Sequence, residues 1–153
     1  MKKYFYIFLI WLGTCFFNAY AVNPKINSKT GIAKQENKIK SMNIKIGKKT
    51  FEVKLENNKT VETLLKKLPM TINMSELNGN EKYFYLSDVL PSDPENVGNI
   101  KTGDIMLFGD NCLVIFYKSF KTSYRYTKIG YIEDSSQLEK VLGKTSIEVT
   151  IIK

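Results

Sequence analysis

The 153-residue sequence contains no histidine, the side chain most often used for acid–base chemistry and metal binding near neutral pH. Without histidine the chain cannot build a serine–histidine or cysteine–histidine nucleophile pair, nor an imidazole metal ligand. Cysteine is scarce, with only Cys15 and Cys112, and Arg125 is the single arginine. The sequence therefore predicts no catalytic residue, no metal site and no cofactor, and it argues against an enzyme.

Residues 1–21 have the three-part pattern of a secretory signal peptide. Two lysines give the positive start, residues 4–17 form an uncharged apolar run, and an Ala-Tyr-Ala sequence ends at Ala21. Cleavage after Ala21 predicts an exported protein, periplasmic or extracellular. There are two alternatives. One is an uncleaved anchor, which would be the protein's only contact with a membrane, and the other is a lipid-modified Cys15.

Residues 22–41 are polar, lysine-rich and nearly free of aromatic side chains. A segment of this composition buries too little apolar surface to offset the entropy lost on ordering, so we predict a flexible polar linker. Removal of the signal and its two lysines leaves 21 basic against 15 acidic residues, a net charge of +6. No run of five like charges marks a binding tail, and we therefore interpret the excess as a solvated surface and predict no nucleic-acid partner.

Hydrophobic periodicity from residue 42 to residue 153 predicts a mainly β domain. Two short helices are expected: one between Asn58 and Pro69, and one opened by a capping box of Ser136 and Glu139. Gly130 is expected to bend its strand, and residues 90–99 are expected to form an irregular loop. Alternating or continuous apolar runs predict a hairpin within residues 42–55 and strands at 71–74, 82–86, 105–108, 112–117, 123–132 and 147–151.

This count gives seven or eight strands and two short helices. A sheet of this size with open edges is prone to aggregation, so closure into a barrel is the economical arrangement. The sequence therefore predicts a closed β-barrel of about eight strands, with the two short helices capping its ends. Within the barrel, the continuous apolar run at residues 112–117 is expected to be a central buried strand, with Cys112 as a packing residue.

Several segments resemble, in order and spacing, the bacterial cyclophilin-like domain family, a small barrel of unknown function. The resemblance extends over residues 42–153 and implies a closed cyclophilin-type barrel with two capping helices. It is carried by LNGNEKYFYL at 77–86 with Pro91, KTGDIMLFGDNCLVIFY at 101–117, SFKTSYRYTKIGYI at 119–132 and LEKVLG at 138–143.

True cyclophilins are peptidyl-prolyl isomerases, and their active strand carries a Phe-His-Arg motif. This sequence has no histidine, and Arg125 stands in Ser-Tyr-Arg-Tyr-Thr, which does not match that motif. The resemblance therefore implies no catalytic residue for this chain.

A first candidate binding site is the polar turn that leads into the strand at 82–86. Asn78, Asn80, Glu81 and Tyr83 cluster there and are candidates to line a polar pocket at the barrel mouth. The alternative is a tight turn in which these side chains only bond the backbone.

A second candidate site brings together aromatic side chains and the arginine at Tyr117, Phe120, Tyr124, Arg125 and Tyr126. Alternation along a strand places Tyr124 and Tyr126 on one face and Arg125 on the other. An aromatic groove beside an arginine suits a peptide or a carboxylate, whereas a partly exposed strand with amphipathic tyrosines is the alternative.

The sequence thus predicts a non-catalytic module that binds a peptide or a small molecule outside the cytoplasm. The residues expected to contact that ligand are Asn78, Glu81, Tyr83, Tyr124 and Arg125. A prolyl isomerase or foldase with a non-standard site around Arg125 is the alternative, and a structural partner of an envelope protein is a third interpretation. The sequence does not indicate whether the protein is a monomer or an oligomer.

Overall fold

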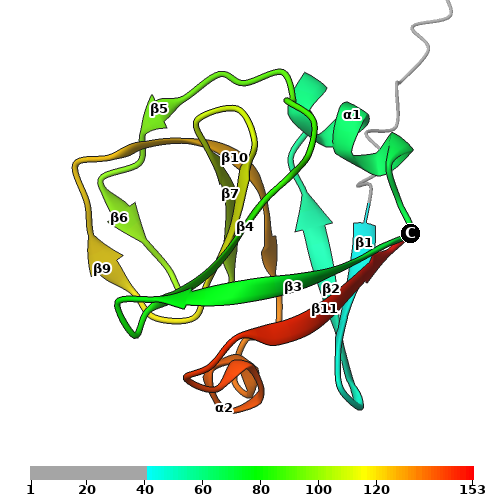
Figure 1. The fold of residues 1–153 in the computed structure, drawn as a ribbon. Helices are drawn as coiled ribbons and strands as arrows, with labels where there is room; N and C mark the ends of the chain where they lie inside the picture. Colours follow the sequence, from blue (N-terminus) through cyan, green and yellow to red (C-terminus); the bar gives the residue numbers. More distant parts are fainter. Residues whose placement is uncertain (1–40) are drawn as a thin grey trace, which may run out of the picture. The chain divides into compact units, whose positions relative to one another are not determined.

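Eight antiparallel strands close into a barrel in the computed structural model, which describes residues 41–153 (Figure 1). The predicted signal peptide and nearly all of the predicted linker lie outside the described residues. The barrel strands are β1 (Ser41–Ile46), β2 (Lys49–Leu55), β3 (Met70–Leu77), β4 (Glu81–Tyr85), β7 (Asp104–Phe108), β8 (Cys112–Phe116), β10 (Arg125–Ile132) and β11 (Ile147–Ile152).

The strands follow the order β2-β1-β11-β3-β4-β8-β7-β10, and β10 pairs back onto β2. This last pairing closes the barrel and confirms the predicted fold class. Three short strands lie outside the barrel: β5 (Glu95–Asn96), which pairs with β10, and β6 (Asn99–Ile100) and β9 (Phe120–Lys121), which pair with each other. The segment expected to be an irregular loop therefore contains β5 and the start of β6.

Closure depends on a glycine at the point where β10 meets β2. Gly130 pairs with Leu55, and the register of β10 against β7 shifts between Lys128 and Gly130. A Cβ atom at Gly130 would lie 2.2 Å from the backbone oxygen of Lys54, which is far inside van der Waals contact. The bend predicted at Gly130 is thus a β-bulge that brings two backbones together.

Helices α1 (Lys59–Lys66) and α2 (Leu138–Leu142) lie on opposite sides of the barrel in Figure 1. The N-terminus of α1 is capped by Asn58, whose Oδ1 accepts a hydrogen bond of 2.9 Å from the Val61 amide. The predicted capping box of α2 is wrong. Gln137 stands at its N-cap without a side-chain hydrogen bond. The Ser136 amide, which a capping box would pair with Glu139, instead donates to Asp134 Oδ1 at 3.1 Å.

Strand β8 separates two hydrophobic clusters, and all five of its residues are buried. Leu113 and Ile115 point into the barrel, where they join the larger core together with residues of both helices. Cys112, Val114 and Phe116 point outward into a smaller cluster with Ile100, Met106 and Tyr126. The outer face of β8 is therefore covered as well, which explains why its sequence is apolar throughout rather than alternating.

No helix within residues 41–153 is both long and apolar enough to cross a membrane.

Candidate functional site

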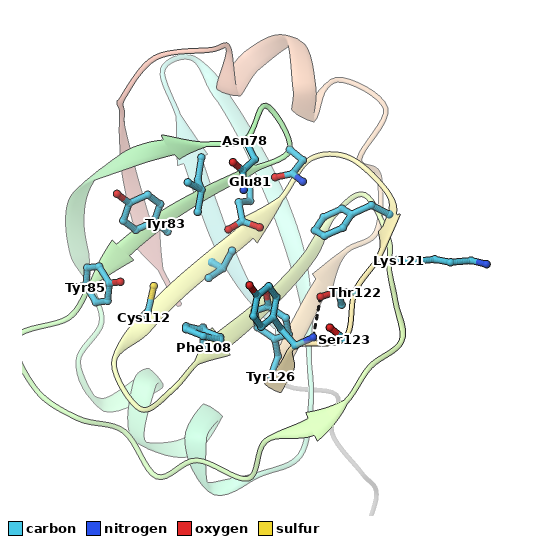
Figure 2. A pocket seen from close by; sticks show the side chains of 15 residues that line it. Asn78, Glu81, Tyr83, Tyr85, Phe108, Cys112, Lys121, Thr122, Ser123 and Tyr126 are labelled. Carbon is cyan, nitrogen blue, oxygen red and sulfur yellow. Dashed lines mark hydrogen bonds between the residues drawn. The ribbon is translucent and has the colours of Figure 1, made fainter.

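A cavity of about 560 Å³ lies on the outer face of the barrel, beside the smaller hydrophobic cluster (Figure 2). Its lining comes from the β3–β4 turn, from β4, from the end of β7, from the first half of β8, from the start of β10, and from the segment 120–124, which consists of β9 and the three residues after it. Segments that are far apart in the sequence meet here because β4 pairs with β8 and β7 pairs with both β8 and β10. The barrel wall thus forms the floor, and the 120–124 segment forms one side.

Six aromatic side chains dominate this lining, and three of them are largely exposed. Tyr124 is 65% exposed, Tyr85 60% and Phe108 42%. The rings touch in edge-to-face or tilted pairs, with centroids 5.5–5.9 Å apart for Tyr83–Tyr85, Phe108–Tyr124 and Phe108–Tyr126. The sixth ring, Phe120, packs on the smaller cluster. The rings therefore form a fixed apolar surface that is open to solvent.

The polar end of the cavity holds Asn78, Asn80 and Glu81. Figure 2 shows the Glu81 carboxylate pointing into the cavity. Glu81 is only 9% exposed, and among residues 41–153 its carboxylate makes no hydrogen bond or ion pair. Burial, and to a lesser degree the negative charge of Glu76, raises the pKa of Glu81 above its ordinary value. The side-chain oxygen Oδ1 of Asn80 is also buried without a partner.

A fully paired network on the other face of β4 supports this end of the cavity. The buried Lys82 ammonium donates hydrogen bonds to Glu76 Oε2 and, at 2.7 Å, to the Thr145 carbonyl. Glu76 Oε1 accepts hydrogen bonds from Tyr117 Oη at 2.7 Å and from the Gly79 amide at 2.8 Å. Burial acts to raise the pKa of Glu76, but the hydrogen bonds from Lys82 and Tyr117 outweigh it and hold this pKa below its ordinary value.

This network fixes the turn between β3 and β4. Asn78 and Gly79 both adopt left-handed backbone conformations, with φ of 55° and 69°. Asparagine and glycine are the residues that accept this conformation at least cost. The hydrogen bond from the Gly79 amide to Glu76 ties the turn to the barrel, so the turn holds Asn78 and Glu81 at the cavity in a set position.

Two other ionisable groups in the cavity are held neutral near pH 7. Burial, followed by the charge of Glu81, raises the pKa of the Cys112 thiol. The same two causes, in the same order, raise the pKa of Tyr126 to about 12. Since the thiolate is the reactive form of cysteine, Cys112 acts here as a packing residue, as the sequence predicted.

The structure brings four of the five predicted ligand-binding residues together: Asn78, Glu81, Tyr83 and Tyr124 line the same cavity. The two candidate sites expected from the sequence are therefore one site. Arg125 is not part of its lining. Its guanidinium instead donates two hydrogen bonds to the Pro94 carbonyl, from Nε at 3.2 Å and from Nη2 at 2.5 Å.

Several lining residues were not singled out in the sequence. Tyr85 had a readable signal, because it lies two residues after Tyr83 on the same strand face. Phe108, Thr122 and Ser123 had none, because only the pairing of β7 with β10 and the course of the chain after β9 bring them to the cavity.

A second concavity, of about 680 Å³, lies between the β3–β4 turn and α2. Its single aromatic residue, Tyr117, is 2% exposed, and much of its lining is charged, including the ion pair of Lys118 with Glu139 at 3.2 Å. It offers little exposed apolar surface. Within residues 41–153, no group of three or more carboxylates and cysteines lies close enough to hold a metal ion.

A closed barrel of eight antiparallel strands with two helices is the architecture of cyclophilin-like proteins. The family model described as "Cyclophilin-like family" matches residues 44–152, and the chain belongs to this family. The solution structure of the hypothetical protein AF2241 from Archaeoglobus fulgidus has a similar fold, with a TM-score of 0.53 and 18% sequence identity. That match covers 77% of this chain and 98% of the archaeal one. No curated protein matches this chain.

Proposed function

We propose that this domain is a non-catalytic module that binds a peptide or a small molecule in the aromatic cavity on the outer face of the barrel. The observation that carries the proposal is the clustering of exposed apolar side chains. Four of the six large ones in residues 41–153 line the cavity, namely Leu77, Tyr85, Phe108 and Tyr124, and only Val89 and Tyr131 lie elsewhere. Exposed apolar groups gathered in one concavity are typical of a binding site.

The energy available at this surface is sufficient for a specific ligand. Burying one aromatic or large aliphatic side chain completely contributes about 1.5–3 kcal/mol. Tyr85, Phe108 and Tyr124 are between 42% and 65% exposed, so a ligand that covered all three would gain roughly half of three full burials, which is still a few kcal/mol. The rings already contact one another, so little side-chain entropy is lost on binding.

The same geometry argues against catalysis. The cavity lining contains a single carboxylate, Glu81, and a thiol whose pKa is raised, so it offers neither a pair of acid–base groups nor an activated nucleophile. Action outside the cytoplasm is part of the proposal and rests on the signal-peptide pattern of residues 1–21.

The test is a titration of the purified, ¹⁵N-labelled protein with pools of short peptides and of fragment-sized amines, acids and neutral aromatics. We expect at least one pool to give saturable amide shifts at Tyr83, Thr122 and Tyr124. Tyr124→Ala should weaken that binding about tenfold. Tyr131→Ala removes an exposed ring from β10, outside the cavity lining, and should leave binding unchanged. The proposal fails if no pool gives saturable shifts, or if both variants weaken binding equally.

The alternative, a prolyl isomerase with a non-standard site, needs Arg125 beside the substrate. In the structure the guanidinium is committed to the Pro94 carbonyl and lies outside the cavity lining, so no observation favours this alternative. A proline-isomerisation assay on the wild type and on Arg125→Ala decides the matter. Catalysis that disappears in the variant would establish the alternative in place of the binding module.

A further inference from the structure

The cavity contains a negative charge that nothing in the described part of the chain balances. Glu81 is about nine-tenths buried, points into the cavity, and has no hydrogen-bond or ion-pair partner there. Its neighbour on the chain, Lys82, is committed to Glu76 on the opposite face of β4. A buried carboxylate normally has a partner, because its loss of hydration is otherwise uncompensated.

The rim supplies no counter-ion either. Lys121 is the one basic residue in the lining, and Figure 2 shows its side chain extending away from the cavity. Residues 41–153 carry 16 basic and 14 acidic side chains, so the domain as a whole adds only a weak positive field. The partner that Glu81 lacks would therefore have to come from a ligand.

The other lining groups suit a cation with N–H donors. Glu81 presents acceptor oxygens at the polar end of the cavity. The rings of Tyr83, Tyr85, Phe108 and Tyr124 lie around the remaining space, and aromatic faces attract an ammonium group while also covering an alkyl chain. An anionic ligand would instead meet the charge of Glu81 without a cation to offset it.

We propose that the cavity binds a primary alkylammonium group, as found on a lysine side chain or a small aliphatic amine, and that Glu81 is its counter-ion. This inference rests on the proposed function, which it deepens by naming the ligand's chemistry. The ammonium would donate to the Glu81 carboxylate, and the alkyl chain would lie against the tyrosine and phenylalanine rings. A metal ion fits the site poorly, because one carboxylate stands alone there.

Three probes test the proposal by NMR titration or calorimetry on the purified protein at low salt. The first is a blocked glycyl-lysyl-glycine peptide, the second is its norleucyl analogue, which has the alkyl chain without the ammonium, and the third is n-butylammonium. We expect the lysyl peptide to bind about tenfold tighter than the norleucyl peptide, because a hydrogen bond to a buried charge contributes that much. Comparable binding of n-butylammonium would identify a small amine as sufficient, whereas binding of the peptide alone would identify a lysine-bearing segment.

Glu81→Gln keeps the shape of the side chain and removes its charge. We expect it to abolish the preference for lysyl over norleucyl while retaining the weaker norleucyl binding. Glu148→Gln is the matched control, since it removes the same charge from an exposed position on β11. It should leave the preference intact.

The preference should also disappear on acidification, as Glu81 becomes protonated. Cys112 from β8 and Tyr126 from β10 line the cavity with Glu81, Glu76 and Tyr117 act on it electrostatically from the other face of β4, and Lys121 lies at the rim. The pKa of Glu76 is lowered, and those of the two tyrosines and the thiol are raised. The lysyl preference should therefore be lost as pH falls through the raised pKa of Glu81, before Glu76 becomes protonated.

The outcomes separate this inference from the proposed function. Saturable binding of the lysyl and norleucyl peptides with equal affinity would overturn the ammonium assignment and leave the binding module standing. A lysyl preference that survives in Glu81→Gln would likewise overturn it. Failure of every probe and of every pool in the earlier titration would count against both proposals.

Discussion

Glu81 and Lys82 are consecutive on β4, yet their side chains lie on opposite faces of the strand and only Lys82 has an ionic partner. Lys82 is completely buried and pairs with Glu76, whereas Glu81 faces the cavity unpaired. A single strand thus carries a satisfied structural charge on one side and an unsatisfied one on the other.

We predict that Glu81→Gln stabilises the fold at neutral pH. Because the pKa of Glu81 is raised in the folded state, the folded protein holds the proton more tightly than the unfolded chain does, and stability falls as pH rises from the ordinary glutamate pKa through the raised one. Removing the charge should add on the order of 1 kcal/mol near pH 7, or a few degrees in Tm. Thermal unfolding of both proteins between pH 3 and pH 8 measures this.

The gain should shrink as pH falls and vanish below about pH 4, where wild-type Glu81 is protonated in both states. Glu148→Gln, at an exposed position, should show no comparable gain. A loss of stability in Glu81→Gln at pH 7 would mean that the carboxylate has a stabilising partner and would contradict this view of the site.

Glu76→Gln should have the opposite effect, because it leaves the buried Lys82 ammonium without its counter-ion. We expect a loss of about 3 kcal/mol in the free energy of unfolding, measured by urea denaturation. The pH dependence is also opposite. The pKa of Glu76 is lowered by folding, so its contribution is present above the ordinary glutamate pKa and is lost as pH falls through the lowered value.

The double variant Glu76→Gln with Lys82→Met removes both charges and should recover much of that loss. Lys82→Met alone should cost less than Glu76→Gln alone, since Glu76 is 20% exposed and keeps its hydrogen bonds to Tyr117 and Gly79. Additive effects of the two substitutions would show that the pair contributes nothing as a pair.

Gly130→Ala should open the barrel at its closing seam. The new methyl group would meet the Lys54 carbonyl at 2.2 Å, so β10 and β2 must separate. We expect a loss of at least about 3 kcal/mol, together with faster amide exchange in β2 and β10. Gly109→Ala is the control: it has a positive φ of 63° but open space for a Cβ, and it should cost only about 1 kcal/mol.

Cys112 should react slowly with iodoacetamide at pH 7, because burial and the charge of Glu81 raise the pKa of its thiol and because it is 5% exposed. Glu81→Gln removes one of the two causes and should accelerate alkylation modestly, by about two- to threefold. Peptide mapping by mass spectrometry identifies the modified residue. Rapid labelling of wild-type Cys112 would show that the thiol is more accessible than its place in the outer cluster implies.

The sequence predicted the fold well wherever one segment carried its own signal. The apolar run of β8 indicated a strand buried on both faces, and Asn58 and Pro69 marked the limits of the region that contains α1. Gly130 indicated the bend in β10. The extent of β3 was underestimated, at 71–74 instead of Met70–Leu77, because polar residues follow Met74 and the strand is completed by pairing with β4.

The site was harder to predict because it is assembled by strand pairing. Tyr83 and Tyr124 are 41 positions apart, and only the order β4-β8-β7-β10 brings them to one cavity. Strand alternation placed Arg125 on the face opposite Tyr124 and Tyr126. The partner of Arg125, the Pro94 carbonyl, could not be predicted because it comes from a loop whose course the sequence does not reveal. The capping box was predicted wrongly for a similar reason, since the Ser136 amide donates its hydrogen bond to Asp134 instead of Glu139.

The part of the barrel formed by β4 and β8 affects how the sequence of this protein can evolve. Its inner side chains pack in the barrel core, and its outer ones, with the 120–124 segment, face the aromatic cavity. Under the proposed function, substitutions at Tyr85, Thr122 or Tyr124 would change which ligand binds without changing the packed interior. This separation makes the scaffold suitable for laboratory selection of new binding specificities, because sequence variation can be confined to the outer side chains of the sheet.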